Sequence, residues 1–303
     1  MISRSCTSIM LGPSTWEPLR GGVVPLLRTH NYSGAVNDDS WLSSTAHVEG
    51  APSVSYVLLD ALGEPLALRS SGRRYYAAST IKLHIMLAVL QEVEASELRL
   101  DDVLTATRTF TGCDGRPFTL TGDHLYPDFP EEGAPLTVEQ AVHLMISRSS
   151  NEATNMCLAL LAEFPNVIAD VCRQLKLVGT KVERQIGDAV AVARGLTNET
   201  CAIDLASTMH AIRYGEFLSE ETEQVALTAL RDQQIRVITR VISDAVDHGS
   251  KSGEIPGIRH DVAFIGDAGM SLAVMTSGMG EAEANETIEA LTMALLSVNR
   301  QGG

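Results

Sequence analysis

Short apolar runs lie near both ends of the chain. Residues 54–60 and 65–69 are two such runs joined by a glycine-containing turn, and runs of this length and spacing predict a pair of β-strands. Two further runs, 259–266 and 270–275, flank another glycine-containing turn and predict a β-hairpin. We expect the segment that carries Lys251 to be a strand beside that hairpin.

The middle of the chain has a longer apolar pattern. Residues 81–90 form an almost continuous apolar run, which predicts a buried helix that begins near Ser79. The pattern stays mainly helical as far as about Leu230, except for a polar and aromatic loop that we expect at 109–135. Two further helices are expected, one near each end of the chain, at 38–49 and 283–298.

Strands at both ends with helices between them predict a discontinuous sheet subdomain. We therefore expect an α/β (α+β) protein in which residues 1–75 and 232–303 form the sheet subdomain and residues 76–231 a mainly helical one. With 303 residues, of which 45% are hydrophobic, the chain can bury a large core. Clefts between subdomains are common ligand sites, so we expect the active site in the seam.

The tetrad Ser79-Thr80-Ile81-Lys82 carries the first candidate chemistry. A serine at a helix start lies close to unpaired backbone N–H groups. A lysine three residues on shares its face, so its amine can reach the serine hydroxyl. A lysine shielded from water has a lowered pKa and can serve as the base that a serine nucleophile needs. Taken alone, the tetrad is better explained as a capped helix with a solvated lysine.

Two later segments supply what such a serine would need. Ser149-Ser150-Asn151 lies between two apolar runs of helical character, so it is expected to be a short polar turn between helices. Lys251-Ser252-Gly253 comes shortly before the predicted hairpin. The order of nucleophile helix, polar turn and lysine-bearing strand makes three coincidental motifs the weaker explanation.

This order and spacing resemble the class A serine β-lactamases and the related penicillin-binding proteins, whose motifs are S-x-x-K, S-D-N and K-T-G. The third motif has Ser252 in place of threonine, and the second has Ser150 where the family usually has aspartate. Asn155, four places after Asn151, also matches the family. The resemblance runs from about Val54 to the last helix and implies a β-lactamase-like fold, with an antiparallel sheet flanked by helices.

The resemblance implies a role for each motif residue. Ser79 would be the nucleophile, Lys82 its base, and Ser149 the relay of a proton to the leaving group. Lys251 would supply positive charge that attracts an anionic substrate. The implied substrate-binding residues are Asn151, which would bind an amide oxygen, and Ser252 and Gly253 of the third motif. The backbone N–H of Glu254 would form an oxyanion hole with that of Ser79. Arg259 would bind a substrate carboxylate.

Several residues near these motifs allow a second interpretation. Arg259 fits an exposed strand arginine equally well. Tyr126 fits the mouth of the cleft or, more simply, packing in a loop. His260 is near the expected pocket but could as easily point away from it.

The expected omega loop departs from the family at the position that governs turnover. Arg184 and Glu199 match the arginine and the acid whose salt bridge closes that loop. Two residues after the arginine, the family has a glutamate that activates the deacylating water, whereas this chain has Ile186. Val190 replaces the asparagine that helps to hold the water. The loop's other acids, out of register with that glutamate, are Glu183 and Asp188. We therefore expect acylation without the usual deacylation machinery.

Charge and cysteine content bear on partners and location. The net charge of −15 argues against nucleic acid, because phosphate binding needs basic patches. The first residues lack the apolar core of a secretory signal, no stretch is long enough to span a bilayer, and the five cysteines show no metal-ligand pattern. We expect no metal, no cofactor, no membrane partner and a cytoplasmic location. A leader removed from this chain would reverse the last point.

Three classes of function stay open, each with a small-molecule ligand. The first is an intracellular serine hydrolase or acyltransferase that acts on a lactam, ester or amide through a Ser79 acyl-enzyme, with weak β-lactamase turnover, as in secondary-metabolite biosynthesis. The second is a genuine β-lactamase or penicillin-binding protein with a non-standard deacylation route. The third is a binder or sensor that is acylated and stays blocked. A carboxylate-bearing lactam or ester is one candidate ligand, and the oligomeric state is open.

Overall fold

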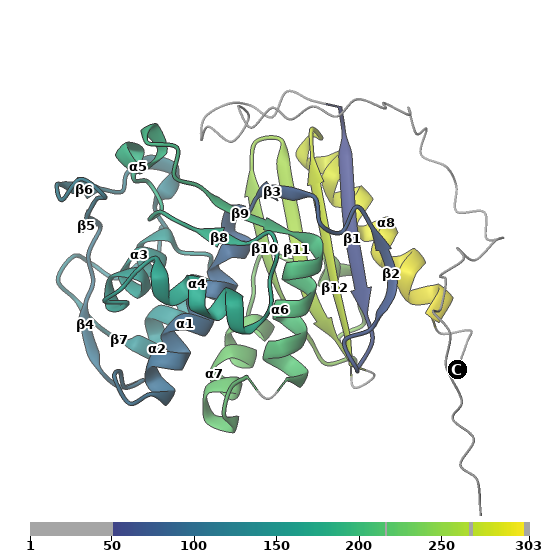
Figure 1. Ribbon diagram of the computed structural model, residues 1–303, viewed down its shortest axis with the longest axis horizontal. Helices are drawn as coiled ribbons and strands as arrows, with labels where there is room; N and C mark the ends of the chain where they lie inside the picture. Colours follow the sequence, from purple (N-terminus) through teal and green to yellow (C-terminus); the bar gives the residue numbers. More distant parts are fainter. Residues whose placement is uncertain (1–50, 216, 267–268, 300–303) are drawn as a thin grey trace, which may run out of the picture. The chain divides into compact units, whose positions relative to one another are not determined.

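A computed structural model describes residues 51–215, 217–266 and 269–299. Within them, a five-stranded antiparallel sheet has the order β10-β11-β12-β1-β2 (Figure 1). Its strands are β1 (Ser53–Leu59), β2 (Pro65–Arg69), β10 (His248–Ile255), β11 (Ile258–Ile265) and β12 (Met270–Ser277). The strand pair and the hairpin predicted from apolar runs are both confirmed, within two residues at each end. The helix expected at 38–49 lies outside the described residues.

The sheet joins segments from opposite ends of the described chain. β1 lies between β2 and β12, and Ser53 pairs with Ser277 across the β1–β12 ladder. The sheet is therefore discontinuous in sequence, as expected. The helix α6 (Ala202–Tyr214) packs against β1 and β12, although its residues fall within the range expected for the helical subdomain. The boundaries 75/76 and 231/232 stay a prediction.

Both faces of the sheet are covered by helices. Successive side chains of a strand point to opposite faces, and along β1 Val57 and Leu59 join the larger apolar cluster while Leu58 joins the smaller one. The larger cluster includes residues of α6, and the smaller one includes residues of α8 (Glu281–Asn299) (Figure 1). The near-continuous apolar character of the central strands follows from burial on both sides.

The remaining helices pack mainly on one another beside the sheet. Every residue of α1 from Lys82 to Leu90 is buried, which confirms the buried helix expected at 81–90. None of the helices in the described residues combines the length and the apolar character needed to cross a membrane. The other helices are α2 (Val138–Ser147), α3 (Asn151–Leu160), α4 (Asn166–Gln174), α5 (Ala189–Ala193) and α7 (Glu220–Arg231).

Short strands and 3₁₀ turns connect these helices. The segment expected to be a loop at 109–135 contains a small β5–β6 hairpin, because three-residue strands are too short to show a period in the sequence. These minor elements are β3 (Arg74–Tyr76), β4 (Val103–Thr105), β5 (Thr109–Thr111), β6 (Pro117–Thr119), β7 (Pro135–Thr137), β8 (Lys181–Val182), β9 (Asn198–Cys201), η2 (Ala78–Ile81), η3 (Gly122–His124) and η4 (Ile238–Val241).

The sheet approaches the helical region closely at Gly253. A Cβ atom on this residue of β10 would lie 2.8 Å from the backbone nitrogens of both Ser79 and Thr80, and 3.1 Å from the carbonyl oxygen of Ala77. These neighbours are backbone atoms that cannot rotate away. Only glycine lets β10 run this close to the turn η2 that leads into α1.

We predict that Gly253→Ala forces β10 and η2 apart. The free energy of unfolding should fall by about 1–3 kcal/mol, which is typical of overpacking, and any covalent reaction at Ser79 should slow. Urea unfolding and acylation rates would measure the two effects. The matched control is Gly72→Ala, because a Cβ at Gly72 meets nothing within 4 Å. Equal stability losses in the two variants would show that close packing at Gly253 is not the cause.

Candidate active site

Ser79 lies in the 3₁₀ turn η2 immediately before α1. The residue before it, Ala78, has φ +47°, in the left-handed region that costs an L-residue about 1–2 kcal/mol. Such backbone strain is concentrated at functional sites. Ser79 is half-buried and lines two adjoining cavities, so its hydroxyl is available to a small molecule.

Lys82 is fully buried one turn after Ser79. Its Nζ lies 2.6 Å from the carbonyl oxygen of Ser149, 3.2 Å from the Ser149 hydroxyl and 2.9 Å from Oδ1 of Asn151. Burial and the nearby Lys251 amine hold the pKa of Lys82 well below its ordinary value, which favours the neutral amine that can accept a proton. Among the hydrogen bonds of the described residues, none joins this amine to Ser79, so the direct contact expected from the sequence is replaced by contacts to Ser149 and Asn151.

Ser149 links the two buried lysines. Its hydroxyl is 3.2 Å from Nζ of Lys82 and 3.1 Å from Nζ of Lys251. The backbone of Ser149 has φ +56°, a second left-handed residue at the site. The turn between α2 and α3, which the sequence predicts, thus holds a strained serine that bridges two amines.

Lys251 projects from β10 and is fully buried. Burial lowers the pKa of its amine to about 7, although the carboxylate of Asp261 opposes this shift. Its Nζ also donates to the carbonyl oxygen of Ser252, 2.6 Å away. At neutral pH, Lys251 is therefore poised between its charged and neutral forms.

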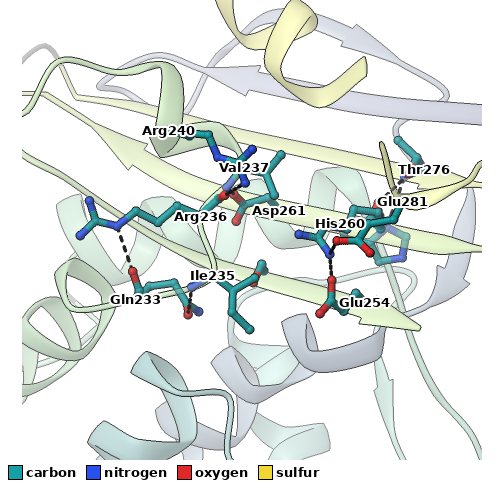
Figure 2. A network of polar contacts seen from close by, with 12 residues as sticks. Gln233, Ile235, Arg236, Val237, Arg240, Glu254, His260, Asp261, Thr276 and Glu281 are labelled. Atoms are coloured by element: carbon teal, nitrogen blue, oxygen red, sulfur yellow. Dashed lines mark hydrogen bonds and ion pairs between the residues drawn. The ribbon is translucent and has the colours of Figure 1, made fainter. Parts of the chain in front are cut away.

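Asp261 is a buried carboxylate that sequence analysis did not identify as part of the site. Its Oδ2 accepts a hydrogen bond from the backbone N–H of Val237, 3.1 Å away (Figure 2). It also accepts one from the backbone N–H of Ile238, 2.8 Å away. Burial nevertheless raises the pKa of Asp261 to about 6. The single acidic residue within the run 259–266 was the signal that could have found it.

The smaller cavity, about 230 Å³, brings together most of the predicted site. It is lined by side chains or backbone of Ser79, Ser149, Asn151, Ser252, Gly253 and Glu254. These residues come from η2, the α2–α3 turn and β10, so the three motifs do meet at one place. The segment 123–127, which includes Tyr126, also lines this cavity, so Tyr126 borders the cleft. Its neighbours Asp123 and His124 also line the cavity and were not foreseen.

Ser150 replaces aspartate in the second motif without loss of local structure. Its hydroxyl accepts from the N–H of Ala153, 3.1 Å away, and so caps α3. The same hydroxyl donates to the buried carboxylate of Glu152, 2.7 Å away. The other oxygen of Glu152 accepts from the N–H of Tyr126, 2.9 Å away. Ser150 is thus a structural residue that ties the turn to the cleft wall.

The omega-loop residue Ile186 is held in place by Asn155 of α3. The side-chain amide of Asn155 binds both its N–H and its carbonyl oxygen, each at 2.8 Å. Ile186 lines the larger cavity, about 590 Å³, together with Ser79. Ile186 therefore shares a cavity with Ser79, and its correspondence to the family's water-activating acid stays a prediction.

The neighbouring acidic residues of the loop form hydrogen bonds away from the two cavities. Glu183 accepts a hydrogen bond from the N–H of Thr197, 3.0 Å away. Asp188 caps α5 and accepts from the N–H of Cys113, 2.8 Å away. Neither residue is among those that line the two cavities. Arg184 donates to the hydroxyl of Tyr76, 2.9 Å away, and its expected salt bridge with Glu199 stays a prediction.

Arg259 lines the larger cavity but is not a free cation. Its side chain is only 6% exposed and forms ion pairs with Glu254 and Glu281. The next residue, His260, is fully buried and lies 3.1 Å from the carbonyl oxygen of Tyr76 through Nε2. Burial lowers the pKa of His260 to about 4. His260 is therefore a neutral structural link between β11 and the segment before η2, and it is not among the residues that line the two cavities.

Ser79 shares a cavity with Ser149, whose hydroxyl lies between two buried lysines, and the cavity lies between an antiparallel sheet and a helical region. These features define a serine enzyme with a β-lactamase-like fold. The chain belongs to the beta-lactamase enzyme family, whose sequence profile matches residues 44–298. No match is found among curated proteins. No cluster of three or more His, Cys, Asp or Glu side chains suited to a metal ion occurs among the described residues.

Solved structures show the same fold. The β-lactamase from Sphaerobacter thermophilus DSM 20745 is 27% identical over 83% of this chain and 93% of its own, with a TM-score of 0.70. PBP-A is 20% identical over 81% of this chain and 91% of its own, with a TM-score of 0.65. The ancestral class A β-lactamase GNCA is 21% identical over 82% and 94%, with a TM-score of 0.67.

We predict that Lys251 makes stability depend on pH above neutrality. Its folded pKa of about 7 lies below the value of about 10.4 for an unfolded lysine. Between these values the unfolded chain binds more protons, so the free energy of unfolding rises with pH. Lys251→Met should remove up to about 1.4 kcal/mol per pH unit of this slope between pH 8 and 10.

Urea unfolding at a series of pH values measures the slope. The control is Lys181→Met, which removes an exposed lysine and should leave the slope unchanged. If both variants keep the wild-type slope, the Lys251 amine is solvated in the folded protein.

Proposed function

We propose that the protein forms an acyl-enzyme on Ser79 with a lactam, ester or amide and that it hydrolyses β-lactam adducts slowly. The observation that carries this proposal is the Ser149 hydroxyl between two buried amines, 3.2 and 3.1 Å away, in a cavity shared with Ser79. The position of Ser149 between two amines supports activation of the Ser79 hydroxyl as a nucleophile. The apolar Ile186, which lines the larger cavity together with Ser79, supports slow turnover.

In the acylation step, the neutral Lys82 amine, which contacts Ser149 and Asn151 in this structure, must turn toward Ser79 to take its proton as the Ser79 oxygen attacks the substrate carbonyl carbon. Because Lys82 contacts Ser149, the proton can then pass through the Ser149 hydroxyl to the leaving nitrogen or oxygen. The C–N or C–O bond breaks, and the acyl group stays on Ser79. Lys251, on the other side of Ser149, assists this transfer by its positive charge.

The backbone N–H groups of Ser79 and Glu254 would stabilise the oxyanion that forms on the carbonyl oxygen. Gly253 brings these two segments into close backbone contact. Preorganised donors of this kind contribute roughly 3–4 kcal/mol each in other acyl-transfer enzymes. Asn151 and Ser252 line the same cavity and would position the substrate.

Deacylation lacks an evident base on the omega-loop side. Glu183 and Asp188 are engaged in the loop itself, and Ile186 cannot accept a proton. A small acyl group from an ester would leave room for water or an acceptor alcohol, with Lys82 as base. An esterase or acyltransferase role, for example in secondary-metabolite biosynthesis, therefore fits the site better than rapid β-lactam hydrolysis.

A penicillin-binding role is a second candidate. A leucine-to-glutamate variant of PBP-A has been solved as an acyl-enzyme complex with penicillin G, and it is 20% identical to this chain with a TM-score of 0.65. Similarity to that protein supports a penicillin as a probe for this chain. A long-lived penicillin adduct is what both a penicillin-binding protein and a covalent sensor would show.

We predict that Ser79 is the only residue acylated by a penicillin, a cephalosporin or an activated ester. Ser79→Ala should abolish the adduct in intact-mass spectra and change the free energy of unfolding by less than about 1 kcal/mol, as expected for a helix-start hydroxyl. Cys157 is a poor alternative, because burial raises the pKa of its thiol to about 12. Peptide mapping that places the adduct on Ser149 would contradict the assignment.

We also predict that Ile186→Glu accelerates release of a cephalosporin adduct. General-base assistance typically contributes about 10²–10⁴-fold, and we expect the lower end because Val190 supplies no amide to position the water. Pre-steady-state kinetics with a chromogenic cephalosporin separate acylation from release. Ile186→Gln has a similar shape without the base and should not accelerate release. Rapid multiple turnover by the unmodified protein would show that another residue activates the water.

A further inference from the structure

The ion pairs of Arg259 change the charge of the larger cavity. Glu254 lies opposite Arg259 in the β10–β11 ladder and pairs with its guanidinium. Glu281, at the start of α8, brings its Oε1 to 3.6 Å from Nη1 of Arg259. Figure 2 shows the two glutamates close together beside β11. The arginine side chain is 6% exposed, whereas the two glutamate side chains are 48% and 77% exposed.

This arrangement leaves the cavity beside Ser79 with excess negative charge. Asp123, Glu254 and Glu281 line it, and Arg259 is the one lysine or arginine in the lining formed by described residues. Both carboxylates approach Nη1 of Arg259, and their two negative charges outweigh the single positive charge of the guanidinium. A substrate carboxylate there would meet like charges in a partly desolvated space, which is unfavourable.

We propose that Glu254 sets the charge selectivity of the site. By holding Arg259, it makes the cavity favour substrates with a neutral or cationic group next to the reacting carbonyl over substrates with a carboxylate there. This inference rests on the proposed acyl-enzyme function and names its substrate class. It differs from the expectation, drawn from resemblance, that Arg259 binds a substrate carboxylate, which stays a prediction.

The geometry also explains why the selectivity resides in Glu254 rather than in Arg259. A buried guanidinium needs a carboxylate partner, and removal of the last one is strongly destabilising. Glu281 remains beside Arg259 when the charge of Glu254 is removed. Glu254→Gln therefore keeps the backbone N–H of residue 254, keeps one partner for Arg259 and frees the other side of the guanidinium.

The test compares a chromogenic cephalosporin that carries its free carboxylate with the methyl ester of the same compound. The measured quantity is the ratio of their acylation rates, acid over ester, for the wild type and for Glu254→Gln. Intrinsic reactivity cancels when the two proteins are compared. The ratio should rise roughly tenfold in Glu254→Gln, the effect of one charge-assisted hydrogen bond gained by the acid.

The control is Glu283→Gln, which removes the same charge from an exposed residue of α8 that does not line either cavity. It should leave the ratio unchanged. An unchanged ratio in Glu254→Gln, or an equal rise in both variants, would overturn the inference. Arg148, which lines only the smaller cavity, is the same in all three proteins.

A second measurement needs no variant and stands if Glu254→Gln does not fold. Salt screens repulsion between charges, so acylation of the wild type by the acid should speed up between low and high ionic strength. Acylation by the methyl ester should not. If salt slows acylation by the carboxylate-bearing compound, the site attracts the carboxylate and the inference is overturned. If salt leaves that rate unchanged, the inference is overturned as well. Absence of any adduct from both compounds would instead remove the proposed function, and this inference with it.

Discussion

Two lysine amines without solvent contact share one serine hydroxyl, and much of the structure serves this arrangement. Two ammonium ions this close in a low-dielectric interior repel strongly, and each has also lost its hydration. At least one amine must therefore be neutral for much of the time, which is the form that can accept a proton. The buried carboxylates of Glu152 and Asp261 favour the charged forms of Lys82 and Lys251 respectively. The balance between burial and these two carboxylates sets which amine carries the charge.

Local sequence patterns were enough to predict most of the fold. The apolar runs of β1, β11 and β12 and the buried helix α1 have clear lengths and periods, so their elements follow from the chain itself. The meeting of Ser79, Ser149 and Lys251 followed from the order and spacing of three motifs, through resemblance to a family. The small β5–β6 hairpin was missed because three residues do not establish a period.

The partners of the site residues were harder to predict than the residues themselves. The contacts of Lys82 with Ser149 and Asn151 depend on how α1 packs against the α2–α3 turn, which spacing does not specify. The pairing of Arg259 with Glu254 follows from strand register once the hairpin is known. Its pairing with Glu281 depends on where α8 begins relative to β11, a long-range feature that no local pattern encodes.

The reactivity of Ser79 depends on completion of the sheet during folding. β1 pairs along its whole length with β12, more than two hundred residues later, so most of the chain must be synthesised before the sheet can close. Contacts between such distant segments form slowly during folding, because their ends must first be brought together. Until β10 and β11 are docked, the amines of Lys82 and Lys251 remain hydrated and ordinary in basicity. The serine is thus an inert hydroxyl in a nascent or partly folded chain, and its nucleophilicity appears only with the finished tertiary structure.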